Sequence, residues 1–564
     1  MDEKPREAAE SKLDPTDLSF PPAVADWWQR AVFYEIYVRS FKDTNDDGIG
    51  DLNGITSKLE YLADLGIDAI WITPFYPSPQ VDFGYDIRDY QNVDPQYGTL
   101  ADFDRLVKEA HQRGIRVICD MVLNHTSDQH PWFLESRPSR RSPRRDWYIW
   151  HDPRGDGPPN NWYSAFGPSA WTLDRKTGQY YYHFFHEAQP DLNWRNPAVE
   201  RAMFDAVRFW LKRGVDGFRL DTVNCLFEDP QLRDNPVLPS FRPGSKTEHA
   251  QELKYNGDLP EIHDVLQRLR ATTDEFGKDR ILIGEIWVKT VEDLMRYYGL
   301  NHDEVHLAFD FFLSSVPSLD AAAFRANVES AERALKGRLI AYMLNSHDMP
   351  RSYDRYGNGP HNDRIAKLLA TMLLSLSGAP FIYYGEEIGM VTTEPATPEE
   401  VLDPLGKCYW PAIKGRDGER TPMQWDSSPN AGFTRGRPWL GIPPSAAARN
   451  VATESADPLS LLNFYRRAIR LRRSSPALHS GKYLSLENDP HIVAYRREAA
   501  GQTVLVALNM SAKKQSLQLD STDTCGARQL RRILDNVSTD EQAMVGSTLD
   551  LIPYQAVVLE VVEG

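Results

Sequence analysis

The chain alternates short apolar segments with amphipathic helical segments, and this alternation constrains its fold more than any other feature. The apolar segments that we interpret as strands are residues 31–41, 67–75, 115–125, 215–221, 281–287, 338–348 and 379–387. Helical patterns lie between them, at residues 57–66, 103–114, 202–214 and 365–378. Nearly continuous apolar strands are typical of a parallel sheet covered on both faces. The pattern therefore predicts an α/β fold, a (β/α)₈ TIM barrel.

Two interruptions of this alternation predict further domains. Between His125 and Pro197 the sequence becomes rich in Trp, Tyr, Pro and Asp, which we interpret as a subdomain inserted after the third strand. From about Tyr483 onward, alternating runs at 491–498, 502–510 and 555–562 indicate antiparallel strands. We expect a polar N-terminal leader at 1–25, a catalytic barrel at 26–125 and 198–478, an inserted subdomain at 126–197 and a C-terminal β-sandwich at 479–564.

Charge, cysteine content and hydropathy limit the kinds of partner and the cellular compartment that we expect for the chain. The chain has 64 Lys and Arg against 80 Asp and Glu, a formal charge of −16, which disfavours nucleic acid and anionic membranes as partners. Its four cysteines (Cys119, Cys225, Cys408 and Cys525) are too scattered to predict a zinc site or a disulfide framework. A charged N-terminus and the lack of long apolar stretches predict neither a signal peptide nor a membrane span. We expect a cytoplasmic protein that binds small molecules; no pattern indicates an oligomeric state.

Three acidic residues directly follow predicted strands: Asp221, Glu285 and Asp348. Catalytic groups of such barrels lie at the carboxyl ends of the strands, although an isolated Asp there is as often the N-cap of the next helix. Retaining glycoside hydrolysis needs a nucleophilic carboxylate and a proton-donating carboxylic acid about 5–5.5 Å apart. Neighbouring strands can place two carboxyl groups at that separation.

Local sequence distinguishes the first two of these residues. Arg219 lies two residues before Asp221, so both side chains point the same way from a strand, and the guanidinium keeps the carboxylate ionised. Glu285 is flanked by Ile and Trp, and an apolar setting raises the pKa of a carboxyl group toward neutrality. We therefore expect Asp221 to act as nucleophile and Glu285 as proton donor.

The strings DMVLNH, GFRLDTV, GEIW and NSHD resemble, in order and spacing, the signature regions of glycoside hydrolase family 13, the α-amylase superfamily. The resemblance covers nearly everything from Trp27 onward. It implies the following roles: nucleophile for Asp221, general acid/base for Glu285, transition-state stabiliser for Asp348 and sugar binding for His125 and His347.

Other strings resemble the exo-acting α-glucosidases related to oligo-1,6-glucosidase, namely DFGYDIRDY, QPDLNW, YYGEEIGM and GRDGERTPMQWD. This similarity implies that Asp82 and Arg416 pair and grip the terminal glucose. It also implies that Tyr85 stacks under the sugar ring and that Phe166 borders it. The residue after the nucleophile is Thr222, where relatives that prefer α-1,6 bonds typically carry Val. A polar residue there favours α-1,4, maltose-like substrates.

The segment DTNDDGIGD resembles the start of a calcium-binding loop, although the closing Glu of an EF-hand is absent. The alternative is a plain Asp/Gly turn. Similarity to α-glucosidases that carry Ca²⁺ or Mg²⁺ here implies one structural ion, and we expect no organic cofactor. The ligands would be the side chains of Asp43, Asn45, Asp47 and Asp51 and the carbonyl of Ile49.

Three functions remain open. The first is a retaining α-glucosidase that hydrolyses terminal nonreducing α-linked glucose, with transglucosylation by the same intermediate. The second is a trehalose synthase or other α-glucosyltransferase, because FYEIYVRSF and HTSDQHPWF also resemble trehalose synthases; DTVNCLF and GRDGERTPMQWD favour the hydrolases. Sucrose isomerases are disfavoured because their arginine-rich string is not found. The third is a noncatalytic binding subunit of the same fold, which the three intact carboxylates disfavour.

Overall fold

The computed structural model describes residues 26–238, 251–486, 489–499, 501–521, 523–525, 529–538, 543–544 and 548–562; the expected leader at 1–25 lies outside them. The apolar segments form one sheet in the order β10-β11-β1-β2-β3-β7-β8-β9, with every neighbouring pair parallel. A parallel bridge from Phe309 to Ala341 joins the two outer strands and closes the ring. The predicted (β/α)₈ barrel is confirmed.

The eight barrel strands are β1 (Phe33–Ile36), β2 (Ala69–Ile72), β3 (Arg116–Val122), β7 (Gly217–Asp221), β8 (Ile281–Gly284), β9 (Leu307–Ala308), β10 (Ala341–Met343) and β11 (Ala379–Tyr383). Each of the seven strands that lie in a predicted segment is shorter than that segment. In residues 31–41 the strand ends at Ile36, and Val38–Phe41 turns into the short helix α1. The two-residue strand β9 was not among the predicted segments, because two residues show no periodicity.

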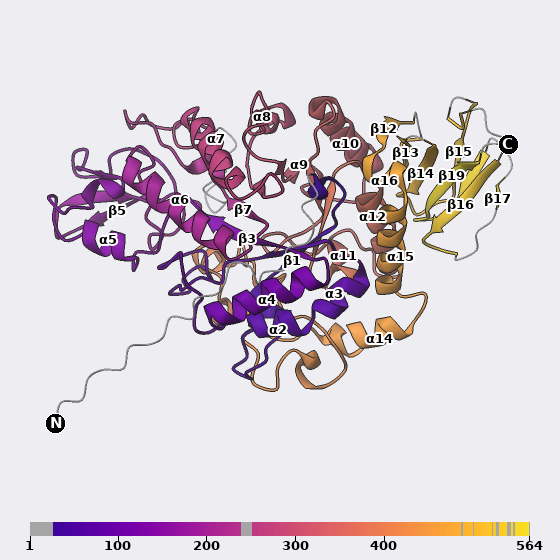
Figure 1. Ribbon diagram of the computed structural model, residues 1–564, viewed down its shortest axis with the longest axis horizontal. Coiled ribbons are helices and arrows are strands. Elements are labelled where there is room, and N and C mark those ends of the chain that lie inside the picture. The colour runs from indigo at the N-terminus through magenta and orange to yellow at the C-terminus, as the bar shows by residue number, and fades with distance from the viewer. Residues whose placement is uncertain are drawn as a thin grey trace.

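Helices surround this barrel (Figure 1). They are α2 (Leu52–Ser57), α3 (Leu59–Leu65), α4 (Leu100–Gln112), α6 (Pro197–Lys212), α7 (Glu261–Asp274), α8 (Val291–Arg296), α10 (Ala321–Leu335), α12 (Asn362–Ser375) and α15 (Leu461–Ser474). Local sequence sets their ends. Helix α4 begins with a capping box between Thr99 and Asp102, and α3 ends at Gly66, whose φ of 96° is left-handed. Within the described chain, no helix combines the length and apolarity needed to cross a membrane.

Alternate residues of the strands fill the barrel interior. Phe33, Trp71, Ile118, Ile283 and Phe381 belong to one buried cluster at the axis. Side chains two residues further along a strand keep the same direction. The inward rows of β1, β3 and β7 therefore end in polar residues at the carboxyl end of the barrel, and these residues build the site described below.

Two smaller β-structures lie at opposite ends of the molecule (Figure 1). One, between β3 and α6, is a three-stranded sheet of β4 (Trp150–His151), β6 (Gln179–Tyr182) and β5 (Trp171–Asp174). The other is C-terminal and antiparallel, ordered β12-β13-β14-β19-β16-β17, with a separate β15-β18 pair. Its bounds are β12 (Lys482–Ser485), β13 (Ile492–Ala499), β14 (Gln502–Asn509), β15 (Gln515–Gln518), β16 (Gln529–Asp535), β17 (Ala543–Met544), β18 (Thr548–Leu551) and β19 (Ala556–Val562).

The C-terminal sheet is buried on both faces. Along β14, Val504 and Val506 join the main core, while Leu505 and Ala507 pack into a second core with residues of β15 and β18. Tyr495 of β13 also meets Ser375 of α12, with 2.6 Å between their hydroxyl oxygens. This packing fixes the outer sheet to the barrel helix α12.

Candidate active site

One buried guanidinium lies at the centre of the site. Arg219 on β7 is the register partner of Asp120 on β3, and its Nη1 donates to Asp120 Oδ1 at 2.9 Å. The same Nη1 donates to Asp221 Oδ1 at 2.7 Å, and Nη2 donates to Glu285 Oε2. Each of these four side chains is buried. The strand register thus gathers three carboxylates around one cation, which we call the Arg219 cluster.

Thr222 connects two of these carboxylates. Its backbone N–H donates to Glu285 Oε2 at 3.1 Å, and its hydroxyl donates to Asp221 Oδ2 at 3.2 Å. Its φ is 33°, in the left-handed region, which is strained for a β-branched residue. The surrounding hydrogen bonds hold this turn, so the backbone itself helps to place the two carboxyl groups.

Burial sets the proton affinity of the cluster. It raises the pKa of Asp221 to about 6 and that of Glu285 to about 7, although Arg219 lowers both. At neutral pH, Asp221 is therefore mostly ionised and Glu285 is close to half protonated. The expected order of the two pKa values is present. The predicted apolar flank of Glu285 does not include Trp287, whose side chain is 48% exposed. Trp287 is therefore not the source of the raised pKa of Glu285.

A second guanidinium organises residues that are distant in sequence. Arg416 donates to Asp82 Oδ1 at 2.7 Å, to Asp348 Oδ1 at 3.0 Å and to Asp403 Oδ1 at 2.7 Å. Arg420 adds a further bond to Asp348 Oδ1 at 2.8 Å. We call these five residues the Arg416 cluster. The expected ion pair between Asp82 and Arg416 is part of it.

The Arg416 cluster keeps Asp348 ionised. Burial would raise the pKa of this carboxyl group, but the neighbouring charges hold it far below its usual range. His347 does not supply that charge, because burial lowers the pKa of its own imidazole well below the usual value. The guanidinium groups of Arg416, Arg420 and Arg219 therefore account for the effect.

The remaining predicted sugar contacts lie between the two clusters. The Tyr85 ring stacks on His347 at 5.4 Å, with 2.7 Å between the Tyr85 hydroxyl and Nε2 of the imidazole. His125 Nε2 lies 3.1 Å from Nε2 of Gln189, and burial lowers its pKa to about 3. Phe166 lies under the Arg416 guanidinium at 5.3 Å. The structure thus brings all the predicted catalytic and sugar-binding residues together.

Several residues of the site were not predicted from the sequence. The residues that complete these contacts are Glu35, Asp120, Gln189, Trp287, Asp403 and Arg420. Asp120 lies in DMVLNH two residues after inward-facing Ile118, so strand parity was a usable signal. Glu35 shares its strand with inward-facing Phe33, and its Oε1 lies 2.6 Å from His347 Nδ1. Asp403 carries no such signal, because it follows a polar loop.

The predicted metal loop is a series of tight turns. Asp43 Oδ2 accepts the N–H of Gly48, Asn45 Oδ1 accepts that of Asp47, and Asp51 Oδ1 accepts that of Gly54 as the N-cap of α2. Gly48 has a φ of 90°, and a Cβ there would lie 1.9 Å from the Arg437 carbonyl oxygen. Among the described residues, no three His, Cys, Asp or Glu side chains converge as a metal site. An ion would therefore also need the amide of Asn45 and the carbonyl of Ile49, an all-oxygen set that fits Ca²⁺ or Mg²⁺.

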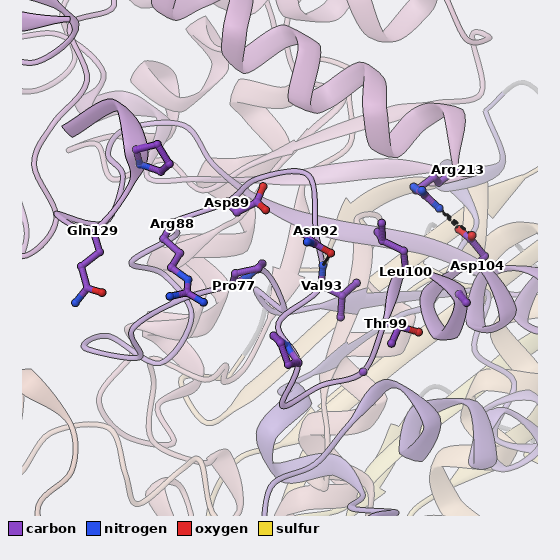
Figure 2. A pocket seen from close by; sticks show the side chains of 14 residues that line it. Pro77, Arg88, Asp89, Asn92, Val93, Thr99, Leu100, Asp104, Gln129 and Arg213 are labelled. Carbon is purple, nitrogen blue, oxygen red and sulfur yellow. Dashed lines mark hydrogen bonds and ion pairs between the residues drawn. The ribbon is translucent and has the colours of Figure 1, made fainter. Parts of the chain in front are cut away.

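A cavity of about 900 Å³ lies elsewhere on the barrel (Figure 2). Arg88, Asn92 and Gln129 line it, and at its edge Arg213 pairs with Asp104 through Nη1–Oδ1 and Nη1–Oδ2 contacts of 2.7 and 2.8 Å. None of the predicted site residues lines this cavity. The chemistry of the molecule is therefore concentrated at the two arginine clusters.

A (β/α)₈ barrel with these carboxylates at its strand ends defines a class of glycoside hydrolases. Residues 35–481 match the family model for the α-amylase catalytic domain, and residues 492–558 match that for the C-terminal domain of the α-amylase SusG. The chain belongs to the α-amylase family, glycoside hydrolase family 13, and is an enzyme of the α-glucosidase type.

Similar proteins are named as glucosidases or glucosyl-transferring enzymes. A “Probable alpha-glucosidase” of Rhizobium meliloti is 44% identical over 503 residues, 88% of this chain and 91% of the relative. The oligo-1,6-glucosidase of Parageobacillus thermoglucosidasius is 38% identical over 95% of this chain and 99% of its own. The solved α-glucosyl transfer enzyme XgtA is 41% identical with a TM-score of 0.89, covering 95% of this chain and 99% of its own. The trehalulose synthase MutB of Pseudomonas mesoacidophila is 37% identical with a TM-score of 0.87, covering 95% and 100%.

Proposed function

We propose that the chain is a retaining α-glucosidase that releases terminal nonreducing α-linked glucose from short, maltose-like substrates. One observation carries the proposal: Asp221 and Glu285 bind the same Arg219 guanidinium. Two carboxyl groups that share one guanidinium are close enough to act on the two faces of a single glycosidic bond. Their pKa values of about 6 and about 7 suit a nucleophile and a proton donor.

In the first half-reaction, a carboxylate oxygen of Asp221 attacks the anomeric carbon, and Glu285 transfers its proton to the leaving glycosidic oxygen. The bond to the leaving sugar breaks as the bond to Asp221 forms, giving a β-glucosyl-enzyme. In the second, ionised Glu285 takes a proton from water, and the oxygen of that water displaces Asp221. Asp348, kept ionised by Arg416 and Arg420, stabilises the positive charge that develops on the sugar ring.

Removal of a single terminal glucose fits the Arg416 cluster. Asp82, Asp348 and Arg416 present charged hydrogen-bonding groups on one side of Tyr85 and His347, where sugar hydroxyls can be held. Such bonds to buried charged groups discriminate strongly against a ligand that lacks the hydroxyl. The preference for α-1,4 bonds rests on Thr222 beside Asp221.

Transfer to a sugar acceptor is the second candidate function. The observation that favours it is the likeness to XgtA and to MutB, whose names state glucosyl transfer and trehalulose synthesis. The same glucosyl-enzyme serves both outcomes, since a sugar hydroxyl takes the place of water in the second half-reaction.

We also propose a cytoplasmic location, which four free cysteines support.

We further propose one structural Ca²⁺ or Mg²⁺ in the loop from Asp43 to Asp51. The residues that would hold the ion are Asp43, Asn45, Asp47, Ile49 and Asp51. Calcium added to chelator-treated protein should raise the midpoint of thermal unfolding by several degrees, and Asp47→Asn should reduce that rise. An unchanged midpoint would leave the loop as a plain turn.

The function is tested by incubating the purified protein separately with maltose, isomaltose, sucrose and trehalose and following the products. Glucose released mainly from maltose supports the proposal. Conversion of maltose or sucrose into another disaccharide with little free glucose contradicts it and supports transfer instead. Glu285→Gln incubated with 4-nitrophenyl α-glucoside should gain the mass of one glucosyl unit, because this leaving group needs no proton.

A further inference from the structure

Trp287 contacts Glu285, although no step described above uses it. Its indole Nε1–H donates to Oε1 of Glu285 at 3.1 Å. Its side chain is 48% exposed, which is unusual for a tryptophan beside buried carboxylates. The contact lies at the boundary between the Arg219 cluster and solvent.

The indole is held from three directions. The Phe311 ring stacks on it face to face, with 3.9 Å between ring centroids and 7° between planes. The side chain of Asn224 binds the Trp287 backbone twice, accepting from its N–H at 3.2 Å and donating to its carbonyl at 3.0 Å. The third contact is the bond to Glu285 itself. Two of these partners fix the ring so that its only N–H points at the carboxyl group.

The two oxygens of Glu285 differ in their surroundings. Oε2 accepts from Arg219 Nη2 and from the backbone N–H of Thr222. These two donors occupy its in-plane lone pairs, so a proton for the leaving group resides on Oε1. The indole N–H therefore donates to the oxygen that gives and takes the catalytic proton.

We propose that Trp287 is a positioning residue whose indole N–H orients Oε1 of Glu285 and favours the ionised form of that carboxyl group. A hydrogen bond to a carboxylate is stronger than one to the neutral acid, so it makes Glu285 a stronger acid in the first half-reaction. This inference rests on the proposed role of Glu285 as general acid/base. The indole N–H thus acts against burial and the neighbouring carboxylates, which raise the proton affinity of Glu285.

Other charged and titratable groups also face Glu285. They are Arg219, Asp221, Asp348, Asp120 and the thiol of Cys225. None of them is altered by a change of the indole to a phenyl ring, and Phe can keep the stack on Phe311. Trp287→Phe therefore removes the N–H while it leaves the other groups in place.

The test is the titration of Glu285 in wild type, Trp287→Phe and Phe311→Leu. The side-chain carboxyl carbon is observed by ¹³C NMR and assigned by its absence in Glu285→Gln. Trp287→Phe should raise the pKa by about half a unit, a modest shift because water can replace an exposed donor. Phe311→Leu keeps the N–H and its backbone anchor at Asn224 but removes the ring stack, so it should raise the pKa less than Trp287→Phe does. An unmoved titration in Trp287→Phe, or an equal rise in both variants, overturns the proposal.

The pH profile of kcat/KM on maltose supplies a second readout. The basic limb of Trp287→Phe should move upward, so that the variant keeps about three times more of its optimal activity than wild type does at a pH above the limb. A merely structural defect lowers activity equally at all pH values and leaves the limb in place. Since the NMR titration needs no turnover, an inactive wild type would contradict the proposed function alone.

Discussion

The Arg219 and Arg416 clusters have the same number of carboxylates but different numbers of cations. Arg219 alone forms ion pairs with Asp120, Asp221 and Glu285. Arg416 and Arg420 together form ion pairs with Asp82, Asp348 and Asp403. Burial raises the pKa of every carboxyl group in the first cluster. In the second, the pKa values of Asp348 and Asp403 are lowered despite burial, whereas burial raises that of Asp82.

This difference separates proton chemistry from binding. With one cation for three carboxylates, negative charge is in excess, and the groups titrate near the pH at which the enzyme must exchange a proton. With two cations, Asp348 and Asp403 stay ionised and act as fixed hydrogen-bond acceptors. We therefore expect changes in the Arg219 cluster to affect kcat and its pH dependence. Apart from Asp348, which stabilises the transition state, we expect changes in the Arg416 cluster to affect mainly substrate binding.

The largest expected effect is that of Asp221→Asn in the Arg219 cluster. The amide keeps the shape of the side chain but is no nucleophile, so kcat on maltose should fall by about 10⁴-fold or more. Thermal unfolding should stay close to that of wild type, since Arg219 keeps Asp120 and Glu285 as partners. A variant that retains a tenth of wild-type kcat would remove Asp221 from its proposed role.

Arg416→Lys should give the next largest effect. A lysine is a point charge that cannot bind Asp82, Asp348 and Asp403 at once. We expect a loss of about 2–4 kcal/mol, roughly 30- to 900-fold in kcat/KM and expressed mainly in KM. Arg213→Lys is the matched control, because Arg213 binds Asp104 beside the cavity in Figure 2, away from the site. An equal loss of activity in the control, or a loss confined to kcat, would break the comparison.

The pH profile sharpens the comparison further. Activity needs Asp221 ionised and Glu285 protonated, so kcat/KM should rise with pH through about 6 and fall again through about 7. The two limbs belong to the interacting pair rather than to either residue alone. Initial rates on maltose from about pH 4 to 9 measure both limbs. If they report the Arg219 cluster, Arg416→Lys lowers the whole profile and leaves the limbs in place; displaced limbs would show that the clusters titrate together.

The sequence predicted the Arg219 cluster better than the Arg416 cluster, for a physical reason. Arg219 and Asp221 lie two residues apart on one strand, where period two alone places them on the same side. Strand parity marks Asp120 as inward-facing, but its pairing with Arg219 depends on the register between β3 and β7, which is a tertiary property. In the Arg416 cluster, the pairing of Asp82 with Arg416 spans 334 residues and was predicted from family resemblance rather than from periodicity. Asp403 lies where no periodic pattern marks a functional residue.

The smallest expected effect concerns Thr222, which binds Asp221 and Glu285 of the Arg219 cluster. Thr222→Val keeps the branched shape at a φ of 33° but loses the hydroxyl that binds Asp221. The ratio of kcat/KM for maltose to that for isomaltose should fall by about fivefold, about 1 kcal/mol, since one contact shifts linkage preference only modestly. Thr222→Ser keeps the hydroxyl and should keep the ratio. If only Thr222→Ser shifts it, the methyl group rather than the hydroxyl selects the linkage. If neither does, linkage preference lies outside both arginine clusters, in the loops around the leaving sugar.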